Sequence, residues 1–205
     1  ELNNLFEANN IIGYIDGKNN DSVVVISAHY DHLGKVGQTV FPGASDNASG
    51  TAMMMTLMKY YSKHQPNYRT VFMAFAGEEA GILGADYYVN HPLFPLSQIK
   101  FLVNLDIMGA GDQGIQVVNG KVFKNQFEKL VELNLTNKYL KEVKTRGESC
   151  NSDHCPFYLK GVPSFFIYTL GGKGFYHDPN DTAESLDLSY SEKVYNLLKA
   201  FIDKL

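Results

Sequence analysis

Four apolar runs constrain the fold of this 205-residue chain more than any other feature. They are "SVVVISA" (22–28), "TVFMAFA" (70–76), "IKFLVNL" (99–105) and "VPSFFIYT" (162–169), and each has the length of one strand. The runs are continuously apolar, which is typical of strands buried on both faces of a parallel sheet. Helical patterns separate them. We therefore expect an α/β fold, an α/β/α sandwich whose mostly parallel central sheet carries helices on both faces, with right-handed crossovers between strands.

The intervening segments predict the remaining elements. Apolar residues at helical spacing predict helices over 47–64, 82–92, 122–135 and 188–205. "IIGYI" (11–15) predicts a strand that a Gly/Asn/Asp turn joins to 22–28, and "GIQVVNG" (114–120) predicts a short edge strand or hairpin arm. "CPFYLKG" (155–161) is typical of a short helix or turn. The length suits one domain spanning residues 1–205.

Charge and hydropathy exclude two classes of protein. The formal net charge is −4 and no basic run is present, which argues against nucleic acid as the main partner. No apolar stretch approaches the roughly 20 residues of a membrane-spanning helix. The sequence begins at Glu1 without a methionine or a signal segment, so we expect a processed or trimmed form of a longer chain.

Cys150 and Cys155 allow three interpretations. Reduced, they are small apolar residues; oxidised, they close a short loop and indicate a compartment outside the cytosol. A zinc knuckle with Asp153 and His154 is a third, weaker interpretation, because the usual Cys-x-x-Cys spacing is absent. Spacing alone leaves the disulfide open.

Histidines and carboxylates follow the predicted strands. Ligands of open α/β sheets bind beyond the carboxyl ends of the strands, so side chains there share one edge. These residues are His29 and Asp31 after the first run, Glu78 and Glu79 after the second, Asp106 after the third, His177 in the loop after the fourth, and Asp46 before the first long helix. The sequence thus predicts a cluster of imidazole and carboxylate groups.

Each of these acids also has an ordinary structural interpretation. Asp46 could cap a helix, Glu78 and Glu79 could complement a helix dipole, and Asp106 could form an Asx turn. Together, however, the carboxylates would repel one another in a partly dry cleft. None of these motifs contains a Lys or Arg. We therefore expect a cation from outside the chain.

Nitrogen and carboxylate ligands together favour zinc, with cobalt or manganese as substitutes. Two Zn²⁺ ions balance three ligating carboxylates and one bridging hydroxide. Each ion would then receive one histidine, one terminal carboxylate and a share of a bridging carboxylate. Asp31 is two residues from His29 and could hold the other ring nitrogen, while one glutamate of the Glu78–Glu79 pair stays free to act as a base.

The motifs resemble the co-catalytic di-zinc aminopeptidases, whose relatives include glutamate carboxypeptidases, the transferrin receptor ectodomain and glutaminyl cyclases. The resemblance rests on "NNIIGYIDG", "SAHYDHLG", "PGASDNASGTA", "FAGEEAGILGA", "NLDIMG", "SDHCPFYLKGVP" and "YHDPNDT", in this order over nearly the whole chain. It implies that Asp46 bridges two metals, that His29 and Asp106 complete one position, and that Glu79 and His177 complete the other. Glu78 would be the general base, and Asp31 would orient His29.

The resemblance also implies supporting residues. Asp153 and His154 match the family's Ser-Asp-His segment, and Asp181 matches an acid downstream of the ligand histidine. Some members carry a tyrosine just before Ser-Asp-His that contacts the substrate carbonyl. Here the sequence reads "GESCN", so the group that stabilises the oxyanion is open.

The implied activity is a secreted or periplasmic exopeptidase, a hydrolase that uses a metal-bridging hydroxide to remove the N-terminal residue of a peptide with a free α-amine. Phe157, Phe175 and Tyr176 are candidates for either an apolar substrate pocket or the core, and Phe165 for the core.

Other activities of the same fold stay open. A carboxypeptidase or dipeptidase needs a cation for the substrate carboxylate, and Arg146 and Lys173 are the candidates. A glutaminyl cyclase would keep one zinc. A receptor-like domain without activity requires the loss of ligands, whereas every ligand position here is filled.

Overall fold

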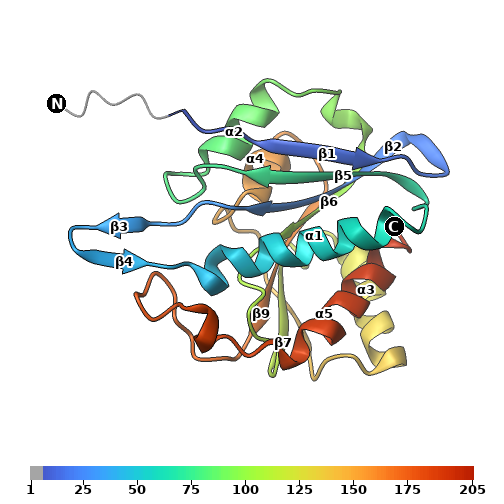
Figure 1. The fold of residues 1–205 in the computed structure, drawn as a ribbon. Helices are drawn as coiled ribbons and strands as arrows, with labels where there is room; N and C mark the ends of the chain where they lie inside the picture. The colour runs from blue at the N-terminus through green and yellow to red at the C-terminus, as the bar shows by residue number, and fades with distance from the viewer. Residues whose placement is uncertain (1–6) are drawn as a thin grey trace.

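A seven-stranded sheet runs through the residues that the computed structural model describes, 7–205 (Figure 1). Its order is β1 (Ile11–Ile15), β5 (Tyr68–Phe75), β2 (Asn19–His29), β6 (Ile99–Leu105), β9 (Ser164–Leu170), β7 (Gly114–Val118) and β8 (Val143–Thr145). The four strands from the apolar runs, β5, β2, β6 and β9, lie side by side and parallel. The predicted α/β class and the parallel centre of the sheet are confirmed.

Helices cover both faces of the sheet, as predicted (Figure 1). One face carries α1 (Gly50–Tyr61), α3 (Lys124–Asn137) and α5 (Ser191–Ile202), and the other carries α2 (Leu83–Asn90) and α4 (His154–Leu159). Alternate residues of β2 point to opposite faces: Val24 packs in the cluster of α1 and α5, whereas Val25 packs in the cluster of α2 and α4. This two-sided burial explains why the run is apolar throughout.

One expectation about the edges of the sheet is wrong. The strand at 114–118 is not an edge strand, because the short β8 pairs parallel to it on the side away from β9. β1 and β2 are consecutive in the chain but do not pair, since β5 lies between them and pairs antiparallel with β1. The predicted helix from residue 47 begins at Gly50, after an irregular helical turn, η1 (Ala44–Ser49), with a cis peptide between Asp46 and Asn47.

A small hairpin that the sequence pattern did not predict projects from the sheet (Figure 1). It consists of β3 (Gly34–Val36) and β4 (Thr39–Phe41), paired antiparallel. Gly37, in the connection, has a φ of 61°, a conformation that glycine adopts without strain. The hairpin separates two segments, 29–32 and 43–46, that meet again beside the sheet.

None of the helices within residues 7–205 has both the length and the apolar character needed to cross a lipid bilayer.

Candidate metal centre

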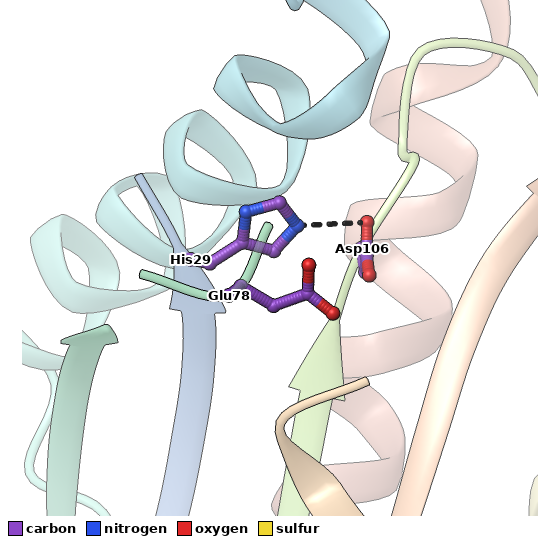
Figure 2. Close-up of side chains that lie close together, drawn as sticks. All are labelled: His29, Glu78 and Asp106. Carbon is purple, nitrogen blue, oxygen red and sulfur yellow. Dashed lines mark ion pairs between the residues drawn. The ribbon is translucent and has the colours of Figure 1, made fainter. Parts of the chain in front are cut away.

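The predicted side chains come together beyond the carboxyl ends of three neighbouring strands. His29 is the last residue of β2, Asp106 follows β6, and Glu78 lies in the turn after β5. Figure 2 shows these three side chains directed toward one another. One donor atom of each lies within 4.8 Å of the others, a spacing that could hold a metal ion.

Asp46 lies between two imidazoles. Its Oδ1 is 3.3 Å from Nε2 of His29, and its Oδ2 is 3.4 Å from Nε2 of His177. Nε2 of His29 is also 3.4 Å from Oδ1 of Asp106, and Nε2 of His177 is 2.9 Å from Oε2 of Glu79. The five side chains therefore form two adjoining groups that share the Asp46 carboxylate.

These spacings fit a zinc centre. Zinc–nitrogen and zinc–oxygen bonds of about 2.0–2.2 Å in a tetrahedron place neighbouring ligand atoms about 3.3–3.5 Å apart. Three of the four distances fall at 3.3–3.4 Å. Nε2 of His29 and Oδ1 of Asp106 are buried and have no hydrogen-bond partner among the described residues. Such atoms carry a desolvation cost that a bound cation would remove.

Glu78 has the properties of a proton acceptor near neutral pH. Burial raises its pKa to about 7, and the carboxylates of Asp106 and Glu79 add to the increase while His29 opposes it. Burial and the nearby Asp46 also raise the pKa of Glu79. A carboxyl with a pKa near the working pH can both take and return a proton.

Asp31 connects His29 to the glutamate turn. Its main-chain oxygen is 3.2 Å from Nδ1 of His29, whereas its carboxylate oxygen Oδ1 is 3.7 Å away. The carboxylate also accepts hydrogen bonds of 3.1 Å from the backbone N–H groups of Glu78 and Glu79. Asp31 thus orients the ring through its backbone and the two glutamates through its side chain.

Asp181 holds the segment that carries Asp46. Its carboxylate accepts hydrogen bonds from the backbone N–H groups of Ser45, at 2.8 and 3.0 Å, and Asp46, at 3.1 Å. Its main-chain oxygen accepts another from Ala44 at 3.1 Å. The side chain is fully buried, so water cannot replace these contacts.

Replacement of Asp181 by asparagine is expected to lower the free energy of unfolding of the metal-free protein by about 1–3 kcal/mol, because one of the two acceptor oxygens becomes an NH2 group, which cannot accept a hydrogen bond from a buried N–H. Chemical denaturation measures this change. The exposed Asp86 of α2 supplies the matched control Asp86→Asn. Equal free energies of unfolding for Asp181→Asn and Asp86→Asn would show that the hydrogen bonds to the Asp181 carboxylate do not stabilise the fold.

A chain of buried hydrogen bonds ends on Asp106. Ser27 donates to Oδ1 of Asn104, Asn104 donates to Oγ of Ser152, and Ser152 donates to Oδ2 of Asp106, each over 2.8 Å. Cys150 and Cys155 form a disulfide that encloses Ser152 in a short loop. The disulfide interpretation is therefore confirmed, and the zinc knuckle is wrong because both sulfurs are bonded to each other.

Asp153 and His154 are buried behind the metal centre. Burial raises the pKa of the Asp153 carboxyl well above its usual range, and neither of its oxygens has a hydrogen-bond partner among residues 7–205. Burial lowers the pKa of His154 to about 4, although its Nε2 donates to the main-chain oxygen of Ser149 at 2.8 Å. The charges of His29, Glu78 and Asp106 act on the Asp153 carboxyl, so it lies near the centre, but neither Asp153 nor His154 forms an ion pair or hydrogen bond with the five clustered side chains.

His32 is the residue at this site that the sequence reasoning left without a role. Its Nδ1 lies 2.7 Å from Oε1 of Glu79. A second set of donor atoms, from His32, Asp46 and Glu79, also has a spacing that could hold a metal ion. The sequence "HYDH" places His32 three residues after His29 and could have indicated a role at the site. It received none because five other ligands already accounted for the charge of two zinc ions.

Comparison with known proteins identifies the family. The model of peptidase family M28 matches residues 10–202. The chain belongs to peptidase family M28. Aminopeptidase YwaD of Bacillus subtilis is 28% identical over 94% of this M28 chain and 44% of its own length. A vacuolar membrane protease of Candida glabrata is 32% identical over 94% of this chain and 20% of its own length. The chain therefore spans less than half the length of these curated relatives.

Solved structures agree with the M28 fold. BSAP, a zinc aminopeptidase from Bacillus subtilis, superimposes with a TM-score of 0.80 at 27% identity, covering 95% of this chain and 49% of BSAP. The aminopeptidase from Aneurinibacillus sp. strain AM-1 gives 0.75 at 26% identity, covering 95% and 46%. A glutaminyl cyclase of an Acidobacteriales bacterium shares the fold. It is 22% identical, with a TM-score of 0.79, and the match covers 94% of this chain and 72% of the cyclase.

A cavity of about 280 Å³ lies beside the centre of the M28 chain. Ile107, Leu170, Phe175 and Tyr176 contribute apolar or aromatic surface to it, and Lys173 also lines it. Of the other aromatic candidates, Phe157 and Phe165 are fully buried core residues. Arg146, the other candidate cation, contributes to neither this cavity nor the apolar cavity between α1 and α5.

Zinc binding to this M28 chain is expected to release protons and to tighten as the pH rises. Burial lowers the pKa of His29, but the neighbouring carboxylates of Asp106 and Asp46 outweigh it and raise the pKa to about 12. A zinc-bound Nε2 must be unprotonated, so the metal displaces this proton. Affinity should therefore rise about tenfold per pH unit for each proton released. Isothermal titration between pH 6 and 8, in buffers of different protonation enthalpy, counts these protons, and an affinity independent of pH would contradict the expectation.

Proposed function

We propose that this chain is the catalytic domain of an aminopeptidase that uses two zinc ions to remove the N-terminal residue of a peptide. The observation that carries the proposal is the shared Asp46 carboxylate, with His29 and His177 on its two sides at 3.3 and 3.4 Å. Zinc is the metal of the BSAP relative, and the carboxylate–imidazole donor set fits it. His29 and Asp106 would hold one ion, Glu79 and His177 the other, and Asp46 both.

The chain's own residues supply the proton transfers. When bound, zinc would act as a Lewis acid and lower the pKa of a bound water toward about 7. Glu78 would take the proton from water on its carboxylate and deliver it to the nitrogen of the departing peptide. Its raised pKa of about 7 suits both steps. Asp31 keeps this glutamate in place by accepting the N–H groups of the turn.

The cavity beside the centre supports a preference for an apolar first residue. Ile107 follows the ligand Asp106 directly, and Phe175 and Tyr176 precede His177, so the apolar wall and the metal ligands belong to the same two loops. Lys173 lines the same cavity, and its positive charge would instead favour an acidic first residue or the carboxylate of the substrate.

A panel of aminoacyl chromogenic substrates, measured with and without a chelator and after zinc is restored, tests the function. We expect leucyl and phenylalanyl substrates to be cleaved fastest, with activity lost to the chelator and regained with zinc. Cleavage restricted to peptides with a free C-terminus and a blocked N-terminus would instead identify a carboxypeptidase. Formation of pyroglutamate from N-terminal glutamine would identify a cyclase.

We also propose that the protein works outside the cytosol, in the periplasm or as a secreted enzyme. The disulfide between Cys150 and Cys155 supports this, because cytosolic thiols are kept reduced. Fractionation of the source cells followed by immunodetection tests it, and a purely cytosolic signal would contradict it.

A further inference from the structure

We infer that His32 is a positioning residue of the second metal position, where it holds the Glu79 carboxylate by the oxygen that does not face His177. The inference rests on the proposed function only in that this position binds a metal. His32 lies in the loop between β2 and the β3–β4 hairpin, whereas His177 comes from the loop after β9.

The two oxygens of Glu79 are divided between two imidazoles. Oε2 is 2.9 Å from Nε2 of His177, on the side where His177 also approaches Asp46. Oε1 is 2.7 Å from Nδ1 of His32. If Oε2 is the ligand atom, His32 contacts the other oxygen and sets the rotation of the carboxylate. A carboxylate ligand that is itself anchored on its second oxygen is the usual arrangement in metal sites.

The ring of His32 is held from several sides. Only 9% of its side chain is exposed. A Cβ at residue 43 would lie 2.5 Å from Cγ of His32, so the glycine at this position lets the ring pack directly against the backbone. The ring of His177 contacts it edge-on, with centroids 5.7 Å apart and an interplanar angle of 65°. These contacts fix the ring where it meets Glu79.

The charges around Glu79 explain why a nitrogen is useful there. Burial and the nearby Asp46 both disfavour the ionised carboxylate of Glu79, whereas His32 and His177 favour it. A metal held at the second position would neutralise one oxygen of Glu79, and the nearby ring nitrogen of His32 would stabilise the other. The 2.7 Å approach of the His32 Nδ1 is an ion-pair contact to the buried Oε1, and no contact to this oxygen from the described residues meets hydrogen-bond geometry.

Three variants isolate the contact. In His32→Asn the amide nitrogen is bonded to Cγ, as Nδ1 is in histidine, so a nitrogen donor stays in place. His32→Gln carries the same amide one bond farther out, and His32→Leu removes the donor. Zinc alone is titrated against a chromophoric chelator. We expect His32→Leu and His32→Gln to lose about 10–100-fold in affinity at one of two zinc positions. The other position should keep its affinity, and His32→Asn should stay within about threefold of the unmodified protein.

The controls separate a local effect from misfolding. His64 is exposed at the end of α1, so His64→Leu should bind both zinc ions as the unmodified protein does. His177→Ala should lose the second ion outright. Circular dichroism of the metal-free proteins reports folding. If His32→Leu fails to fold, the difference in zinc affinity between His32→Gln and His32→Asn tests the inference.

Two results would overturn the inference. One is unchanged affinity at both positions in His32→Leu and His32→Gln, and the other is a His32→Asn variant as weak as His32→Leu. X-ray absorption of the loaded protein adds a third test: more than one imidazole per zinc on average would make His32 a ligand and not a positioning residue. Two bound zinc ions without peptide cleavage would defeat the proposed function while leaving these affinities interpretable.

Discussion

Replacement of Glu78 by glutamine is expected to leave the zinc content unchanged and to lower kcat by about 10²–10⁴. Glutamine keeps the shape of the side chain but cannot accept a proton from water. Metal is retained because His29, Asp106, Asp46, Glu79 and His177 are all still present. Metal analysis and steady-state kinetics on the best aminoacyl substrate measure the two quantities.

The matched control is Glu128→Gln, the same substitution at an exposed position of α3. It should change neither zinc content nor kcat. If Glu78→Gln retains full turnover, Glu78 is not the base. If it loses zinc, Glu78 is a ligand, since its carboxylate lies within reach of His29 and Asp106.

Replacement of Asp46 by alanine is expected to remove both metal and activity. Among residues 7–205, Asp46 is the one side chain that forms ion pairs with both His29 and His177, at 3.3 and 3.4 Å. Its loss takes a ligand from each position, so the fall in zinc affinity should exceed the roughly 10–100-fold cost of removing an outer partner. Zinc content after dialysis and residual peptidase activity report the result.

Asp86→Ala, at an exposed position of α2, serves as the control for loss of a carboxylate. The metal-free Asp46→Ala protein should remain folded, because removal of the acid relieves repulsion with Glu79. A fully loaded and active Asp46→Ala variant would contradict the bridging role.

The centre of the fold could be predicted because its four parallel strands are buried on both faces and are therefore apolar throughout. The edges could not. β8 has only three residues, with partly or fully exposed side chains, so no apolar pattern marks it. Nothing local shows that β5 inserts between β1 and β2, because that order results from tertiary packing.

The candidate site was predictable for a related reason. Parallel strands end at one edge, so residues that directly follow them, such as His29 and Asp106, must meet. The finer contacts depend on side-chain directions, which spacing does not determine. The Asp31 carboxylate also accepts hydrogen bonds from the glutamate turn, and the ring of His32 packs against Gly43 beside the site.

The relay from Ser27 through Asn104 and Ser152 has a consequence for the number of groups a metal could accept. Every donor in the relay points toward Asp106, so Oδ2 of Asp106 already accepts a hydrogen bond while Oδ1 accepts none from the described residues. This difference favours Oδ1 as the atom that would hold a metal, and attachment through one oxygen would keep the number of protein ligands low. An incoming amine or carbonyl could then find a vacant coordination position without displacing any side chain.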